Sequence, residues 1–187
     1  RPYLQTNLAF QFYRTDGYQE NSEWIKGNLS TRFYYKINDN FDISLSLRLH
    51  DSKWDAPGYI PEYQFKDRDW AKKQAINAED DGGEKEFYSQ RLDFGYNFAE
   101  NIKFLYWIYA TQQDFTRFAK FGYKPSGQTE RNYVRNVYGT GGSINFETQL
   151  LSYPVVGITG IEYYYENTDW KRWNTSNRVR ISQIQDR

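Results

Sequence analysis

The 187-residue sequence predicts an all-β protein: one antiparallel sheet of about seven strands, of the type that forms a transmembrane β-barrel. Apolar and polar residues alternate with a period of two through most of the chain. The alternating segments run to about 10 to 14 residues, whereas strands of soluble proteins have a mode of about 5–6 residues. Short and long connections follow one another in turn, which predicts short turns at one end of the sheet and long loops at the other.

Each strand is predicted from two side-chain sets that separate completely by parity. In residues 41–49, Phe41, Ile43, Leu45, Leu47 and Leu49 alternate with polar residues. A helix would scatter the two sets around its axis, whereas a strand places them on opposite faces. The same pattern predicts strands at 4–13, 28–37, 91–98, 102–111, 133–146 and 155–166. Glycines interrupt the faces of the last two, as they do at bends or close backbone approaches.

The connections are predicted from the gaps between these strands. Residues 38–40, 99–101 and 149–154 are expected to be short turns. Residues 15–26, 51–87 and 113–132 are expected to be long loops, and residues 167–187 to continue from the last strand as another. Structureless loops of such length are uncommon inside compact soluble domains. Outer-membrane barrels have short turns on the periplasmic side and longer loops on the extracellular side. We therefore interpret the short turns as periplasmic and the long loops as extracellular.

The two faces of the strands indicate where the sheet lies. A soluble sandwich or lipocalin-like barrel would turn the apolar face inward and is the alternative. Ten residues tilted by ~45° cover ~23 Å of the membrane normal, close to the ~25 Å apolar band of outer-membrane barrels. Aromatic residues gather near both strand ends with aliphatic residues between them, as in interfacial girdles. The opposite face is too charged for a packed core, and its candidate lumen-facing residues are Arg32, Arg48, Arg91 and Asp93.

Composition excludes several classes of protein. The mean hydropathy of −0.93 and the lack of a long apolar run exclude helical membrane spans. With 24 basic and 24 acidic side chains there is no electrostatic case for nucleic acid as a partner. The 18 Tyr, 13 Phe and 6 Trp argue against disorder. The sequence has no cysteine, so disulfides, thiolate metal sites and cysteine nucleophiles are absent.

Aromatic and cationic residues in the predicted long loops are candidates for ligand capture. An aromatic surface would hold an amphipathic ligand, and cations would attract an anionic chelate. The alternative is that the aromatic rings pack the loops against one another while the cations are solvated. Residues 69–75 are predicted to form a short loop helix. The candidate ligand-binding residues are Trp54, Tyr59, Tyr63, Trp70, Arg117 and Tyr123.

Catalytic, metal and cofactor sites are not predicted. His50 is the only histidine, and the sequence shows no nucleophile or paired-carboxylate motif to accompany it. The acidic residues 79–84 lack the alternating ligand spacing of a calcium loop, so we expect an exposed acidic turn there. No phosphate-binding glycine loop is present. We therefore expect a protein that is not an enzyme.

Three segments carry a resemblance to a known family. Residues 16–22, with the sequence DGYQENS, resemble a "DGYRxNS" segment of TonB-dependent outer-membrane receptors. Residues 51–61, DSKWDAPGYIP, resemble the "WDAPGY" segment that opens a large outer loop in receptors of the ferric-siderophore type. Residues 160–166, GIEYYYE, are similar to a "GxEYxxE" strand later in those barrels. The order and spacing of the three segments span nearly the whole chain.

The resemblance implies a 22-stranded barrel in the bacterial outer membrane, plugged by an N-terminal domain and energised by the TonB complex. Residues 1–187 are then expected to be part of one barrel domain, with the plug absent from this chain and other strands, on this or another chain, completing the sheet. The implied function is active uptake of a ferric siderophore or similarly scarce ligand, with outer-membrane lipid as a further partner. The alternative is a structural or assembly component, a split or incomplete barrel without transport.

Overall fold

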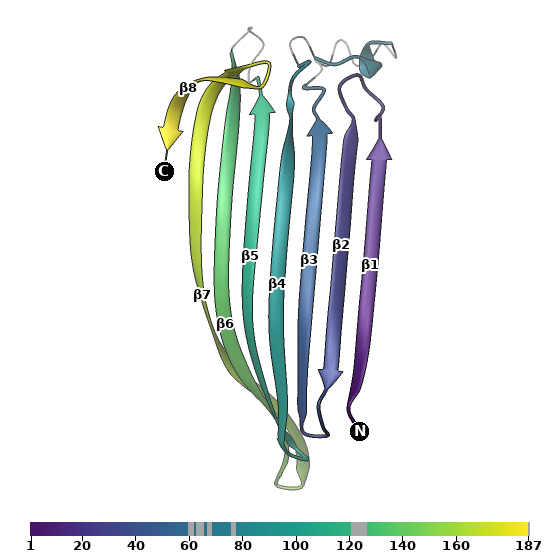
Figure 1. Ribbon diagram of the computed structural model, residues 1–187, viewed down its shortest axis with the longest axis vertical. Coiled ribbons are helices and arrows are strands. Elements are labelled where there is room, and N and C mark those ends of the chain that lie inside the picture. Colours follow the sequence, from purple (N-terminus) through teal and green to yellow (C-terminus); the bar gives the residue numbers. More distant parts are fainter. Residues whose placement is uncertain (60–61, 63–65, 67–68, 76–77, 121–126, 187) are drawn as a thin grey trace.

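The computed structural model describes residues 1–59, 62, 66, 69–75, 78–120 and 127–186. It contains one antiparallel sheet of eight strands in the order β1-β2-β3-β4-β5-β6-β7-β8, so every strand pairs with its neighbours in sequence (Figure 1). The strands are β1 Tyr3–Thr15, β2 Trp24–Lys36, β3 Phe41–Asp55, β4 Gly82–Ala99, β5 Ile102–Ala119, β6 Gln128–Leu150, β7 Tyr153–Ser176 and β8 Val179–Asp186. A short 3-10 helix, η1 Trp70–Lys72, lies within the helix predicted for residues 69–75.

The loop predicted for residues 167–187 is wrong, because β7 and β8 occupy most of these residues and bring the strands to eight where about seven were predicted. β7 continues to Ser176, and Asn177 and Arg178 then form a tight turn with φ of 49° and 63° before β8 begins. Positive φ at both central residues is the geometry of a two-residue hairpin turn that matches the twist of the strands. The usual sequence signal for this turn is Asn-Gly, and arginine in the second position conceals it.

The outer loops are also shorter than predicted. β3 extends to Asp55 and β4 begins at Gly82, so the predicted loop 51–87 is reduced at both ends. β5 extends to Ala119 and β6 begins at Gln128, which turns most of the predicted loop 113–132 into strand. Alternation continues through these residues, but charged side chains on both faces hide it. The placement of short turns at one end and longer loops at the other is confirmed (Figure 1).

Side-chain hydrogen bonds fix the short-turn end of the sheet. The Asn38 side-chain oxygen accepts hydrogen bonds from the backbone N–H groups of Asn40 (2.9 Å) and Phe41 (2.8 Å), which closes the turn between β2 and β3. The Lys36 ammonium lies 2.6 Å from Asp39 and lowers the pKa of that carboxyl group. In the turn between β4 and β5, the Asn101 amide donates to the Glu147 carbonyl (2.8 Å), which links that turn to the hairpin of β6 and β7.

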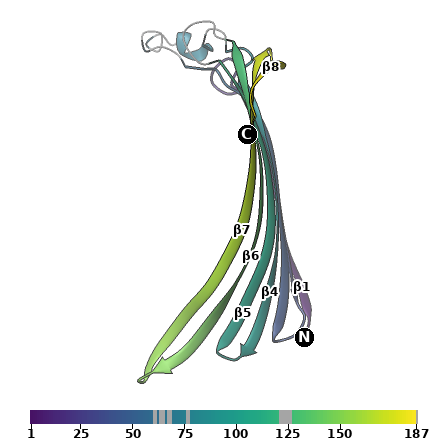
Figure 2. The ribbon, with the colours of Figure 1, turned by 90° about the vertical axis from the view of Figure 1, so that its left-hand side faces the viewer.

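The sheet is a single curved layer with two distinct faces (Figure 2). The apolar face is the one that carries Leu45, Leu92 and Ile108, which are directly opposite one another on β3, β4 and β5. The polar face carries the residues between them. Within the described part of the chain, only Ala78 and Ala119 are buried hydrophobic residues, whereas Leu8 is 74% and Ile161 81% exposed. No second layer covers the apolar face among the described residues, so the sheet lacks the packed core of a soluble sandwich.

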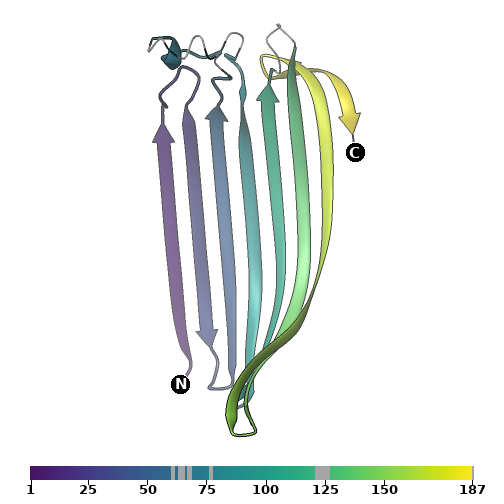
Figure 3. The ribbon, with the colours of Figure 1, turned by 180° about the vertical axis from the view of Figure 1, so that it is seen from behind.

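The apolar residues form a band that crosses the strands obliquely. The lowest apolar residue of β1, Leu4, lies in the same ladder row as Ile161 of β7, yet the apolar face of β7 continues four steps further, to Tyr153. At the other end, Phe12 lies in the row of Asp169, whereas the apolar part of β7 on this face ends at Tyr165, two steps lower. Three polar residues, Asn167, Asp169 and Lys171, separate Tyr165 from the next aromatic residue on this face, Trp173. A slab that meets tilted strands has this geometry. The long hairpin of β6 and β7 is the lowest part of the sheet (Figure 3).

Glycines in β6 make room for large side chains of β5 on the polar face. A Cβ at Gly139 would lie 2.2 Å from the ring of Tyr109, and a Cβ at Gly141 would lie 2.6 Å from the ring of Trp107. Each ring therefore occupies the space that a side chain at the glycine of the next strand would need. The glycines that interrupt the predicted strand 133–146 are thus positions where a large side chain of the neighbouring strand fills the space.

Among the described residues, no helix has the length and apolar character needed to cross a membrane.

Candidate functional site

The four predicted lumen-facing residues lie together at the centre of the polar face. Arg32, Ser46 and Arg91 are in one ladder row, and Asp93 is in the next. Arg91 forms an ion pair with Asp93 at 2.7 Å, and its guanidinium group lies 5.1 Å from the ring centroid of Trp107. Two further ion pairs lie on this face, Lys103–Asp42 at 3.4 Å and Arg135–Glu166 at 2.5 Å. Arg32 donates a hydrogen bond to the Ser44 hydroxyl at 3.2 Å.

His50 belongs to a hydrogen-bonded chain on the same face. Its Nδ1 lies 2.5 Å from the Asn28 side-chain oxygen and its Nε2 lies 3.1 Å from the Ser52 hydroxyl. Hydroxyl, imidazole and side-chain carbonyl in this order resemble a hydrolytic triad. Ser52 is only 5% exposed, however, and the N–H groups of β3 face the ladders of β2 and β4, so they provide no oxyanion hole. We therefore assign these residues to stabilising the paired strands.

A row of aromatic rings crosses the polar face near the long-loop end. Trp54 of β3, Phe115 of β5, Tyr133 of β6 and Trp170 of β7 follow one another with ring centroids 5.6, 6.1 and 6.1 Å apart. The last pair is stacked, with an interplanar angle of 27°. These rings form a continuous, half-buried aromatic surface at the upper edge of the polar face.

Three arginines lie in the ladder row of Trp54, next to the row of Phe115, Tyr133 and Trp170 and on the same face. Arg117 of β5 is directly opposite Arg131 of β6, which is directly opposite Arg172 of β7. Like charges directly opposite one another are destabilising, so their alignment concentrates positive charge at some cost to the sheet. Arg117 was predicted to lie in a loop, and that prediction is wrong: it is a strand residue because alternation in β5 continues to Ala119.

The other predicted loop residues have different outcomes. Trp54 also lies in a strand, at the end of β3, and belongs to the aromatic row. Tyr59 lies beyond β3 and is 86% exposed. Trp70 begins η1, but its side chain is outside the described part of the structure, as are Tyr63 and Tyr123. The structure therefore brings Trp54 and Arg117 to one surface.

A buried polar network ties the outer loops to the sheet. Gln128, at the start of β6, is 1% exposed and uses both ends of its amide. Its nitrogen donates to the Asp80 carbonyl (2.8 Å) and to the Asp81 carboxylate (3.2 Å). Its oxygen accepts from the Thr175 hydroxyl (3.1 Å) and from the Arg178 backbone N–H (2.9 Å). Residues 79–84 are therefore not the exposed acidic turn that we predicted, since Asp81 is buried where it accepts these hydrogen bonds.

Arg178, in the turn between β7 and β8, joins the same network from the far end of the sequence. Its guanidinium group donates to Asp55 at 2.7 Å and to the Asp80 carbonyl at 2.9 Å. Asn21, in the loop between β1 and β2, donates to the carbonyls of Ala56 (2.9 Å), Ala78 and Asp81 (3.3 Å). The central residues of this network are called the loop clasp below: Asn21, Asp55, Asp81, Gln128 and Arg178.

The loop clasp accounts for two of the three segments that carried the family resemblance. Asn21 comes from the segment 16–22, and Asp55 from the segment 51–61. In the first segment, Gly17 has φ of 77° and lies against the Ser22 side chain, a position that a side chain at residue 17 could not share. These residues hold the bases of the loops in place, and their positions give no indication of ligand contact.

Beside the loop clasp, β8 is held by a second charged pair. Arg180 binds both carboxylate oxygens of Glu130, with nitrogen–oxygen distances of 2.7 and 3.0 Å, and lies 3.8 Å from the Trp173 ring centroid. Glu130 is 2% exposed, and its hydrogen bonds raise the pKa of Arg180. This pairing explains why the last residues of the chain form a strand.

Sequence reasoning missed most of the residues that these surfaces share. Arg131, Arg172, Phe115, Tyr133 and Trp170 were not candidates. Alternation predicts which residues of one strand share a face, but the register that aligns residues of different strands depends on turn lengths. The available signal was the alternation itself, which continues beyond residues 133–146 and 155–166 toward the long loops and would have included these residues.

Comparison with known proteins gives a structural match. No protein-family model matches the sequence, and no curated protein matches it. The chain superposes on the crystal structure of the ferric citrate transporter FecA in its unliganded form with a TM-score of 0.86 and 17% sequence identity. The fold of this chain is that of a β-barrel segment. The alignment covers 98% of this chain and 28% of the FecA chain, so the chain spans little more than a quarter of that protein's length. The predicted fold class is confirmed.

Proposed function

We propose that this chain is a segment of a TonB-dependent outer-membrane receptor that takes up a ferric chelate or a similarly scarce anionic ligand. The observation that carries the proposal is the superposition of nearly the whole chain on a ferric citrate transporter. The oblique apolar band supports a bilayer as the surroundings of the outer face, because its uncovered aliphatic and aromatic residues would otherwise face water. The polar face would line the lumen, and the intact receptor would engage the TonB complex.

Uptake tests the proposal directly. In cells whose only route for ferric citrate is the complete receptor, we expect accumulation of radiolabelled ferric citrate or of a ferric siderophore to disappear when TonB is deleted. The physical reason is that a ligand held tightly at the outer surface needs an energy source to be released inward. Uptake that persists without TonB would contradict the mechanism. Normal membrane assembly without uptake of any ferric chelate would favour the structural or assembly alternative.

The arginine row gives a prediction at residue level. We expect Arg172→Ala to weaken capture of ferric citrate by about tenfold, since a hydrogen bond to a charged group contributes about 1.5–3 kcal/mol. Lys171→Ala is the matched control, because Lys171 is the neighbouring cation in β7 and lies on the other face. Binding is measured with the intact receptor in detergent at two salt concentrations. An equal loss in both variants would show that general charge, and not the arginine row, attracts the ligand.

A further inference from the structure

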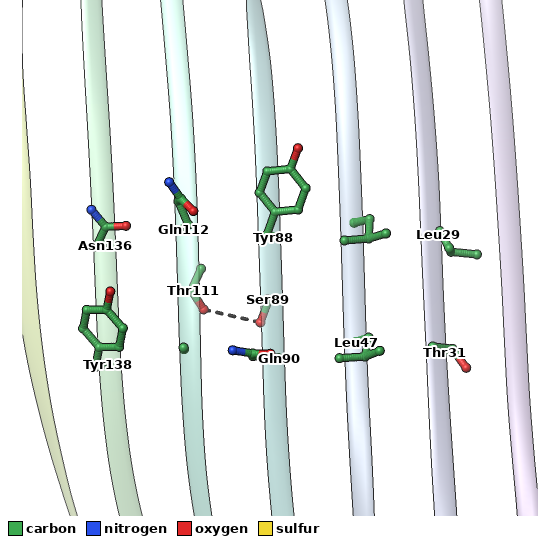
Figure 4. A pocket seen from close by; sticks show the side chains of 12 residues that line it. Leu29, Thr31, Leu47, Tyr88, Ser89, Gln90, Thr111, Gln112, Asn136 and Tyr138 are labelled. Carbon is green, nitrogen blue, oxygen red and sulfur yellow. Dashed lines mark hydrogen bonds between the residues drawn. The ribbon is translucent and has the colours of Figure 1, made fainter.

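A hollow in the middle of the sheet lies on the apolar face, away from the polar surfaces described above. It is a groove of about 400 Å³ over β2 to β6 (Figure 4). Leu29, Leu47 and Leu49 border it on one side and Tyr138 on the other, while Ala110 leaves the space between them open. The groove is therefore apolar along most of its length and lies within the band that we place in lipid.

Three amide side chains interrupt this apolar lining. Gln112 of β5 is directly opposite Asn136 of β6, and Gln90 of β4 is directly opposite Ala110. In the described part of the chain, none of the three amides has a side-chain hydrogen bond. An amide without a partner in an apolar medium costs free energy, so a partner from outside the chain would stabilise it. Ester or phosphate oxygens are acceptors that suit the amide N–H groups.

Carboxylates lie next to the groove on its long-loop side. Asp51 of β3 is directly opposite Glu86 of β4, which is directly opposite Asp114 of β5. This row is two residues, or about 7 Å, along the strands from Tyr88 and Gln112. Asn132 donates to Asp114 at 2.7 Å and Tyr88 to Glu86 at 3.3 Å. The cations of this face lie one row further. Lys53 is paired with Glu84 at 3.6 Å and Arg14 with Glu23 at 2.8 Å, and Lys171 lies at the β7 end of that row. The row therefore keeps a net negative charge.

We propose that the groove is a binding site for a zwitterionic phospholipid with a primary ammonium head group, of the phosphatidylethanolamine type. One acyl chain lies along the leucines and Ala110, the three amides donate to the ester and phosphate oxygens, and the carboxylate row receives the ammonium group. An anionic lipid without an ammonium group would bring its negative charge close to Asp51, Glu86 and Asp114 without a positive group of its own to pair with them. The proposal rests on the bilayer placement of the apolar face given under the proposed function.

Native mass spectrometry of the intact protein in detergent tests the site. The protein is titrated with phosphatidylethanolamine and, separately, with phosphatidylglycerol. We expect the ethanolamine lipid to bind about fivefold to tenfold more tightly. Ala110→Phe fills the groove and is expected to abolish this preference, whereas Thr6→Phe, on the same face of β1 but outside the groove, is expected to leave it unchanged. Equal binding of the two lipids, or an unchanged preference in Ala110→Phe, would overturn the proposal.

A second variant covers the case in which Ala110→Phe does not assemble. Glu86→Gln combined with Asp114→Asn removes charge without changing size, and we expect the two lipids to bind it equally. A preference that persists in this double variant would also overturn the proposal. The chain has no cysteine, so Leu92→Cys carries a single nitroxide label that reports bilayer contact. If oxygen reaches this label but no lipid preference is found, the groove proposal alone fails. If oxygen does not reach it, the bilayer placement fails too.

Discussion

Leu45→Arg is expected to prevent assembly of the protein in the outer membrane. Leu45 lies at the middle of the apolar band, directly opposite Phe33 and Leu92. An arginine at the bilayer midplane on the lipid face of a barrel costs about 2–4 kcal/mol. The loss is measured as the fraction of protein in the outer-membrane pellet, and by heat-dependent mobility of the folded form in gels.

Ser46→Arg is the matched control for this prediction. Ser46 is the next residue of β3, lies on the polar face and is directly opposite Arg32 and Arg91. A third arginine in this row would be repelled by its neighbours but would remain hydrated, so we expect membrane assembly to continue. Assembly of Leu45→Arg together with failure of Ser46→Arg would show that the two faces are assigned the wrong way round.

Gln128→Leu is expected to release the outer loops while leaving the sheet assembled. The substitution removes the amide that joins Asp80, Asp81, Thr175 and Arg178, and it leaves buried groups without partners. Each such group costs about 1–3 kcal/mol, so we expect the loop bases to lose about 2–4 kcal/mol of local stability. Hydrogen–deuterium exchange measures this as a rise of about 30-fold or more in the exchange rates of residues 78–82.

The control for the loop clasp is Gln149→Leu, in the exposed hairpin between β6 and β7. It makes the same chemical change where no buried partner is lost, so exchange in residues 78–82 should not change. Exchange rates at these residues that are equal in Gln128→Leu and the unaltered protein would contradict the loop clasp. An increase throughout the sheet would show that Gln128 stabilises the strands and not the loop bases alone.

Period-two alternation was sufficient to predict the class of the fold and the faces of the strands. The apolar and polar residues of 41–49 fall on opposite faces of the strand without exception. The register places Leu45 and Arg91 on opposite faces of the sheet, as expected. Alternation failed where both faces become polar. The outer ends of β5 and β6 carry charged residues on both faces, Asp114 and Glu130 on one and Arg117 and Arg131 on the other.

The candidate site was harder to predict, because it depends on contacts between residues far apart in the sequence. Arg178 meets Asp55, which is 123 positions away, and no local pattern links them. Asp81 has the sequence context of an exposed turn, but backbone and side-chain donors from three other segments surround it. The aromatic row depends on register in the same way. The predicted long loops were expected to capture a ligand, whereas Asn21, after the first strand, and Asp55, at the end of the third, fix the bases of those loops.

The most direct test of the account is the accessibility of single nitroxide labels on adjacent residues of β3. Because the chain has no cysteine, Leu45→Cys and Ser46→Cys each carry one label in the membrane-embedded protein. We expect molecular oxygen, which concentrates in lipid, to relax the label at residue 45, and a water-soluble nickel chelate to relax the label at residue 46. The reverse pattern, or equal access of the chelate to both labels, would contradict an apolar band that faces lipid and a polar face that lines a lumen.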